Sequence, residues 1–169
     1  MTEPTASPPK GRARVLADAT TRGLDVEIVE RPAADSLEQA AGLLGIRPAD
    51  IVKSLVVRRT KPLPATYLFA LVPGDRQISW PKLRALVGAN KLVMPDEALA
   101  IEATGYGRGT ITPLGSTTAW PVYADATMTG RRIAMGAGDH GYSAFVDADA
   151  LIAAFSATVA DITEPLAPR

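Results

Sequence analysis

The stretch Ile51–Val57, IVKSLVV, places one lysine inside an otherwise largely apolar run. β-Branched residues dominate the run, which is typical of a strand that is covered on both faces. A buried ammonium group without a partner is costly or loses its proton. Lys53 therefore either lies near the exposed start of the strand and reaches water, or points into a pocket that needs a cation.

A second stretch with possible chemistry is the loop TGYGRGTITPLG at residues 104–115. Its glycines let the backbone approach a ligand closely and leave N–H groups free to donate. The spacing matches neither a Walker loop nor a dinucleotide fingerprint, because Gly-Lys-Ser/Thr is absent and the loop follows a predicted helix. The loop is either a tight chain reversal or a surface whose backbone amides hold a carbonyl or ribose oxygen. For the second alternative it combines the flexible Gly109, the hydroxyls of Thr110 and Thr112, and Pro113 as a rigid end.

A third stretch, GAGDHG at residues 136–141, joins two predicted strands. Its simplest interpretation is a hairpin turn in which His140 is solvated. Alternatively, Gly136, Gly138 and His140 form a second wall of the same pocket.

The composition limits the chemistry that these stretches can support. The chain has 169 residues, no cysteine, one histidine, and 18 basic against 18 acidic residues. Disulfides, thiolate nucleophiles and multi-histidine zinc sites are therefore excluded. The zero net charge gives no bulk argument for nucleic acid, so such a partner must meet a local patch. The short basic runs at 58–61 and 131–132 are usual for solvated turns, but together they could contact phosphates.

The elements that must position these residues mix helices and strands without strict alternation, which predicts an α+β domain with a mixed sheet. Capping and periodicity predict helices over 12–21, 37–44, 79–87, 96–103 and 147–155. Strands are predicted over 26–29, 52–58, 67–72, 91–93, 122–124, 133–136, 142–146 and 159–162, with 52–58 and 67–72 paired as a hairpin.

The domain is expected to span residues 10–165, after a disordered tail over 1–9 that is rich in Pro, Ser and Thr. No stretch matches a signal peptide or a membrane span, so we expect a cytoplasmic protein.

Taken in order, the motifs resemble those of the YbaK/EbsC family, aminoacyl-tRNA deacylases related to the editing domain of bacterial prolyl-tRNA synthetases. The resemblance rests on a Ser-capped helix ending LGI, then IVKSLVV, ALVPGD, a helix beginning Lys82-Leu, and TGYxxGxIxPLG at 104–115. It runs from about Val26 to Ile162. It implies a single α+β domain with a central, partly barrel-like sheet. It also implies hydrolysis of the ester that joins a wrong amino acid to the terminal adenosine of a tRNA, typically the tRNA for proline.

By this resemblance, Lys53 matches the family's essential lysine, and Gly109 matches the glycine of a Gly-x-x-x-Pro loop that closes on Pro113. Ser54 neighbours the lysine, and the 136–141 turn lines the pocket. Lys53 would hold the aminoacyl carbonyl or a phosphate, while the N–H groups of Gly109 and Thr110 would face the oxyanion. The family implies no metal and no cofactor. The implied partners are the 3′ acceptor end of aminoacyl-tRNA and, as a further candidate, prolyl-tRNA synthetase, with no membrane.

Two matters stay open in the sequence. The cysteine-clearing branch tends to have a serine at the place of Gly136, and members closer to the synthetase insertion often use a histidine in the region of His140, so the rejected amino acid is not fixed. The alternative function is a non-catalytic binding or regulatory module of the same fold, which binds tRNA 3′ ends, amino acids or a synthetase.

Overall fold

The computed structural model describes residues 10–167, so the tail expected over 1–9 lies outside the described residues. The α-helices of this part of the chain are α1 (Gly11–Thr21), α2 (Leu37–Leu44), α3 (Trp80–Val87), α4 (Glu97–Thr104) and α5 (Ala148–Phe155), with short 3-10 helices η1 (Pro48–Asp50) and η2 (Ala126–Met128). None of these helices is long and apolar enough to cross a membrane.

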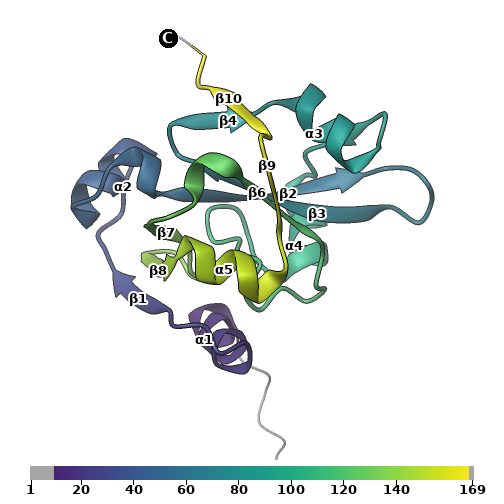
Figure 1. The fold of residues 1–169 in the computed structure, drawn as a ribbon. Coiled ribbons are helices and arrows are strands. Elements are labelled where there is room, and N and C mark those ends of the chain that lie inside the picture. The colour runs from purple at the N-terminus through teal and green to yellow at the C-terminus, as the bar shows by residue number, and fades with distance from the viewer. Residues whose placement is uncertain (1–9, 168–169) are drawn as a thin grey trace, which may run out of the picture.

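A mixed five-stranded sheet forms the centre of the fold, in the order β5-β2-β3-β6-β9 (Figure 1). Its strands are β2 (Val52–Arg59), β3 (Thr66–Pro73), β5 (Leu92–Val93), β6 (Val122–Asp125) and β9 (Thr158–Ala160). β2 pairs antiparallel with β3 and β5, whereas β6 runs parallel to both β3 and β9. The predicted hairpin is confirmed, and it projects from one end of the molecule (Figure 1).

Two smaller antiparallel sheets flank the centre. β1 (Glu27–Glu30), β8 (Tyr142–Asp147) and β7 (Arg132–Gly136) form one, and β10 (Thr163–Pro165) with β4 (Arg76–Ile78) forms the other. A parallel bridge between Ile51 and Ala134 joins the start of β2 to β7. The strands between residues 10 and 167 do not close into a barrel. The predicted α+β domain with a mixed sheet is confirmed.

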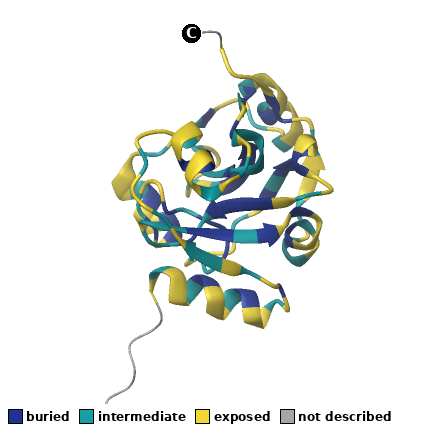
Figure 2. Cartoon of the chain, turned by 90° about the vertical axis from the view of Figure 1, so that its left-hand side faces the viewer, coloured by how far each residue is buried: buried dark blue, intermediate teal, exposed yellow. Residues whose placement is uncertain are grey.

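Both faces of the central sheet are buried, which explains the apolar runs in its strands. On β3, Phe69 and Leu71 belong to the larger core cluster, which lies against the β1-β8-β7 sheet, α1 and α5. The alternate residues Leu68, Ala70 and Val72 belong to a second cluster with α3. Figure 2 shows these buried strands at the centre and the exposed outer faces of the helices around them.

The predicted helix boundaries follow local capping chemistry. The Ser36 and Asp147 side chains accept from backbone N–H groups at the starts of α2 and α5, and Gly45 ends α2 in the left-handed region. Ser79 stands at the N-cap of α3, as the helix predicted from residue 79 requires, but its side chain makes no hydrogen bond to the helix. Instead, the main-chain N–H of Ser79 donates to the carbonyl of Ile162, beside the β4-β10 pair that the sequence did not predict.

Candidate active site

A pocket of about 710 Å³ lies along β2, between α2, the glycine loop and β7. This volume is in the range of small-molecule sites. Four of the expected site residues, Lys53, Ser54, Gly109 and Gly136, line it. The rest of its wall is made mainly by the segments 34–40, 51–56, 94–100 and 134–136, together with Arg31, Arg108, Ile111, Tyr142 and Ser143. The residues expected from the sequence therefore come from three of the segments that meet here.

The main chain of β2 presents hydrogen-bonding groups to this pocket. The N–H of Gly74 donates to the carbonyl of Ile51 at 2.7 Å, so Ile51 and every second residue after it direct their main-chain groups at β3. Ser54 is one of the intervening residues, so its N–H and C=O point to the edge of β2 that faces away from β3. β5 covers that edge only at Arg58 and Arg59. The pocket therefore borders a strand edge whose donors and acceptors are open around Ser54.

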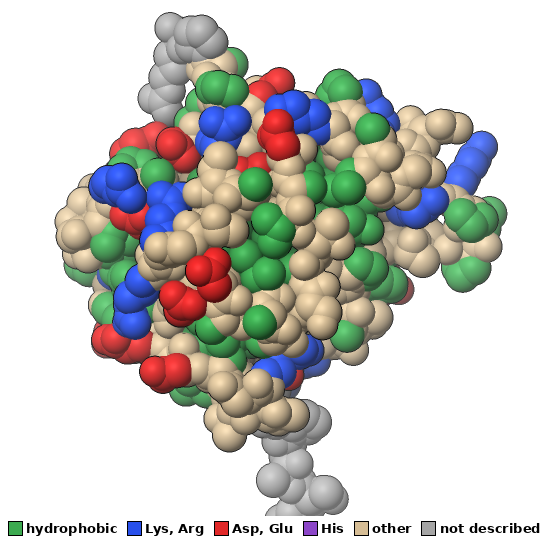
Figure 3. Space-filling model, viewed as in Figure 1, with side chains coloured by type: hydrophobic (Ala, Val, Ile, Leu, Met, Phe, Trp, Pro, Cys, Tyr) green, Lys and Arg blue, Asp and Glu red, His purple; other side chains and the backbone are tan. Residues whose placement is uncertain are grey.

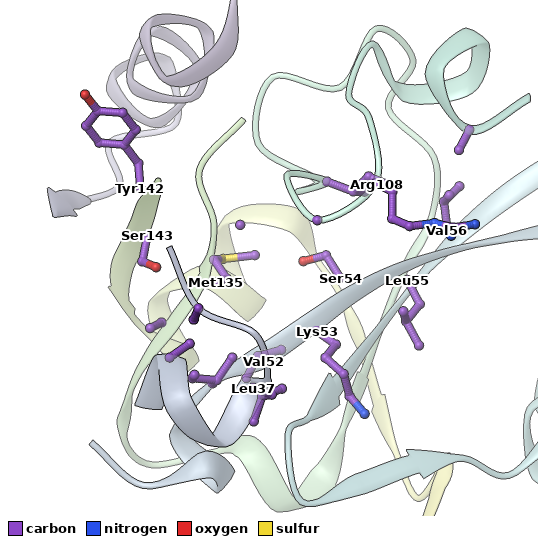
Figure 4. Close-up of a pocket in the computed structure, with 18 of the residues that line it drawn as sticks. Leu37, Val52, Lys53, Ser54, Leu55, Val56, Arg108, Met135, Tyr142 and Ser143 are labelled. Atoms are coloured by element: carbon purple, nitrogen blue, oxygen red, sulfur yellow. The ribbon is translucent and has the colours of Figure 1, made fainter. Parts of the chain in front are cut away.

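The side chains of Lys53 and Ser54 leave β2 on opposite faces, as successive residues of a strand must (Figure 4). The Ser54 side chain lies on the face of the buried Val52 and Val56, toward Met135. Its Oγ is buried and has no hydrogen-bond partner among the described residues. A buried hydroxyl without a partner costs roughly 1–3 kcal/mol. The Ser54 hydroxyl is thus available for a hydrogen bond to a ligand.

The ammonium group of Lys53 is held by a main-chain carbonyl. Its Nζ donates to the carbonyl of Arg76 in β4 at 2.7 Å, and the side chain is part-buried. Burial lowers the pKa of Lys53 below its ordinary value, and the nearby carboxylates of Asp75 and Glu38 oppose that shift. The sequence left open whether Lys53 reaches water or points into a pocket. In the structure it lines the pocket, but its ammonium group is bonded to a main-chain carbonyl of the protein.

The glycine loop is fixed against β7 and the turn that follows it. A side chain at Gly136 would place its Cβ 2.4 Å from the carbonyl oxygen of Ile111, so only glycine lets the loop approach β7 this closely. The N–H of Gly138, at φ +84°, donates to the carbonyl of Thr110 at 3.0 Å. The two glycine-rich stretches, 104–115 and 136–141, therefore meet, but of the turn residues expected to wall the pocket only Gly136 lines it, whereas Gly138 and His140 do not.

The N–H of Gly109 is one of several in this loop that have no acceptor within residues 10–167. Its φ of +84° is in the left-handed region that favours glycine. The N–H of Thr110 already donates to the carbonyl of Gly107 at 3.1 Å, whereas no acceptor within residues 10–167 takes the N–H of Gly109. His140 is exposed, and its ring lies beside Gly109, with Cε1 3.6 Å from where a Cβ would stand.

The remaining expected residues of the loop are engaged within the protein. The Thr110 hydroxyl donates to Gly107 at 2.7 Å, and the Thr112 hydroxyl accepts from the N–H of Leu114 at 3.2 Å. Thr110, Thr112 and Pro113 are buried, and none of them is among the residues that line the pocket. Their contacts give the loop its shape.

Two pocket arginines were missed by the sequence analysis. Arg31 donates from Nε to the hydroxyl of Ser143 at 3.2 Å and from Nη1 to Pro32 at 3.1 Å. Arg108 is exposed on the glycine loop beside Gly109. A signal for Arg108 was present, since it stands inside the glycine-rich motif, but Arg31 follows an unremarkable short strand. Between residues 10 and 167, no three His, Asp or Glu side chains are grouped as a metal site.

A comparison with known proteins identifies the family of this chain. The model of the aminoacyl-tRNA editing domain matches residues 31–154, the region that contains every wall of the pocket. The chain belongs to this family. A solved structure described as a putative trans-editing enzyme for prolyl tRNA synthetase shares 29% identity with a TM-score of 0.83, over 94% of this chain and 99% of that one.

Curated relatives of this editing domain are proline–tRNA ligases. The enzyme of Heliobacterium modesticaldum is 35% identical over 60% of this chain and 17% of its own length. That of Geobacter metallireducens is 31% identical over 73% of this chain and 20% of its own length. The chain therefore spans about a fifth of the length of these relatives, and it is homologous to their editing-domain region.

Proposed function

We propose that this editing domain is a trans-editing hydrolase that cleaves the ester of mischarged aminoacyl-tRNA, with Cys-tRNA(Pro) or Ala-tRNA(Pro) as its substrates. The observation that carries the proposal is the meeting of Lys53, Ser54, Gly109 and Gly136 in one pocket of an editing domain. The solved structure described as a putative trans-editing enzyme, which the chain matches over almost its full length, supports the same reaction.

The reaction needs a stabilised oxyanion more than a strong nucleophile. Water attacks the ester carbonyl carbon, the C=O electrons move to oxygen, and the C–O bond to the ribose then breaks. The products are a free amino acid and a tRNA whose ribose hydroxyl has regained a proton. The open N–H of Gly109 is the donor for the oxyanion, and one such donor is worth about 2.7–4 kcal/mol of the barrier.

Lys53 and Ser54 bind the substrate around this donor. One N–H of the Lys53 ammonium is used by the carbonyl of Arg76, so two of its three donors are left for a carbonyl or phosphate oxygen. The Ser54 hydroxyl and main chain can hydrogen-bond to the aminoacyl group from the open edge of β2. Catalytic hydrogen bonds are often completed only when substrate binds.

Selection against correctly charged proline would come from size. Apolar side chains of Leu37, Ala40, Val52 and Met135 line the pocket. Favourable binding separates amino acids of similar shape poorly, so an apolar pocket discriminates best against side chains that are too large to enter it. A pocket that admits the side chain of Cys or Ala and excludes the larger Pro ring would give the required discrimination.

The test is to incubate the protein with tRNA(Pro) charged separately with Cys, Ala and Pro, and to follow ester loss. The variant is Lys53→Ala and its matched control is Lys82→Ala. Lys82 also donates from Nζ to a main-chain carbonyl, that of Thr163 at 2.9 Å, but it does not line the pocket. Release of Cys or Ala but not Pro, lost in Lys53→Ala and retained in Lys82→Ala, is the expected result.

Ester loss at the spontaneous rate from these and from a wider panel of charged tRNAs would overturn the proposal. The protein would then be a binding module of the same fold, and Lys53 a ligand contact at most. Equal loss of activity in the two lysine variants would instead show that Lys53 has no special role.

A further inference from the structure

The charge of this neutral chain is strongly segregated along the sequence. Of its 18 basic and 18 acidic residues, residues 51–95 contain eight basic and one acidic residue. The basic residues are Lys53, Arg58, Arg59, Lys61, Arg76, Lys82, Arg84 and Lys91, and the acidic one is Asp75. This segment comprises the β2-β3 hairpin, β4, α3 and β5, so basic residues outnumber acidic ones in this part of the fold despite the zero net charge.

Four of these cations lie at the projecting hairpin, with Arg58 and Arg59 on opposite faces of β2, and we name Arg58, Arg59, Lys61 and Lys91 the basic hairpin patch. Arg58 and Arg59 are paired with Val93 and Leu92 of β5, which brings Lys91 beside the start of the turn. In Figure 3, basic and apolar side chains cover the hairpin at the right of the view, while most acidic side chains lie toward the left and top.

The charges of the basic hairpin patch are not neutralised. No carboxylate in residues 10–167 forms a salt bridge with any of its four members. The guanidinium of Arg59 donates to the carbonyls of Lys61, Val87 and Gly88, which fix its position and leave its charge uncompensated. A fixed cation loses less side-chain freedom when it binds an anion.

The other basic run of the sequence provides a contrast. Arg131 pairs with Asp50 at 3.2 Å, and Arg132 pairs with Glu27 at 2.6 Å while it stacks over the ring of Phe145. Both arginines are therefore occupied by partners within the protein. Of the two runs that the sequence offered for phosphate contact, the structure leaves only the one on the hairpin open.

The basic hairpin patch continues the wall of the pocket. Val56 lines the pocket, and Lys61 follows it by five residues, at most about 17 Å away, since β2 ends at Arg59. On the neighbouring strand, Met94 lines the pocket three residues after Lys91. Two adjacent segments thus lead from the pocket to the patch. The turn at 60–65, which joins β2 to β3, has no acidic residue, and its Leu63 is 83% exposed.

We propose that the basic hairpin patch binds backbone phosphates of the tRNA arm whose aminoacylated 3′ end lies in the pocket. This inference rests on the proposed function, because it takes the same tRNA as the ligand. A polymer with one phosphate per nucleotide fits a row of uncompensated cations that begins at the pocket wall. Contacts of this kind hold the tRNA without reading its sequence.

The test measures the affinity for uncharged tRNA(Pro) at several salt concentrations, with Lys61→Gln/Lys91→Gln as the variant. The control, Arg47→Gln/Arg132→Gln, removes the same charge from exposed arginines outside the patch. The slope of log affinity against log salt is expected to be smaller in the variant by about 1.4–1.8, the loss of two phosphate contacts. The control is expected to keep the slope of the unmodified protein.

An unchanged slope in the lysine variant, an equal change in both variants, or no measurable binding of tRNA would overturn the inference. Equal binding of polyglutamate, with the same dependence on the two lysines, would also overturn it, because the patch would then take any polyanion. The assay needs no hydrolysis. Patch-dependent binding without ester cleavage would therefore refute only the proposed function, whereas cleavage with an unchanged slope would refute only this inference.

Discussion

Replacing Gly136 with alanine is expected to displace the loop that carries Gly109. The added Cβ would stand 2.4 Å from the carbonyl oxygen of Ile111, where ordinary contact begins near 3.4 Å, so the loop must shift by about 1 Å. A misplacement of about 1 Å can cost about 100-fold in rate. Overpacking of this kind costs about 1–3 kcal/mol in stability, and each kcal/mol lowers the Tm by about 2–4 °C in a chain of this size.

Two assays separate the local shift from general unfolding. Deacylation of the proposed substrate should fall by about 100-fold in kcat/KM, on the estimate for a 1 Å misplacement. Amide exchange at Gly138 should accelerate, because its N–H donates to the carbonyl of Thr110 in the displaced loop. The matched control is Gly42→Ala, since a Cβ at this helical position meets nothing within 4 Å. It should leave the rate unchanged and stabilise α2 slightly, because alanine favours helix over glycine.

Retention of the rate and of the slow amide exchange in Gly136→Ala would refute this prediction. The close approach of Ile111 to β7 would then not be what positions Gly109. A loss of rate that only follows the unfolded fraction, with slow exchange at Gly138 in the folded protein, would also count against it.

Two predictions concern the structure that supports the site. Asp125→Ala should lower the free energy of unfolding, measured with urea, by about 3 kcal/mol or more, since hydrogen bonds to charged groups contribute about 1.5–3 kcal/mol each. The fully buried side chain of Asp125 accepts hydrogen bonds from Thr127, Ile162 and Thr163. A loss under about 1 kcal/mol would contradict this prediction. Burial raises the pKa of Tyr106 to about 12, so the unfolded chain ionises first and stability should fall with pH from about 10 until about 12. Urea unfolding of Tyr106→Phe should lack this part of the pH dependence, and an unchanged pH profile would refute the assignment.

Much of the fold was predictable because it depends on contacts close in sequence. Ser36, Gly45 and Asp147 set helix ends through bonds to main-chain groups within a few residues. The hairpin followed from two apolar runs separated by a short turn. The β4-β10 pair was not predictable, because its strands have three residues each and lie more than 80 residues apart.

The candidate site also has features that the sequence predicts and features that it does not. The sequence alone identified Lys53, the glycine loop around Gly109 and the 136–141 turn as stretches with unusual residues for their surroundings, and it supplied the family resemblance that the comparisons confirmed. Those properties are encoded in neighbouring residues. The sequence could not say which cations would stay free of a carboxylate, since Arg132 and its partner Glu27 are far apart in the chain.

Only the tertiary structure decided how these stretches face one another. Strand alternation sets Lys53 and Ser54 on opposite sides of β2. The packing of β7 and the glycine loop determines that the Ser54 hydroxyl remains without a partner, and the position of β4 determines that Lys53 is anchored to Arg76. The open edge of β2 likewise exists because β5 is too short to cover it. Such features depend on where distant segments end and meet, and no local pattern of residue types specifies that.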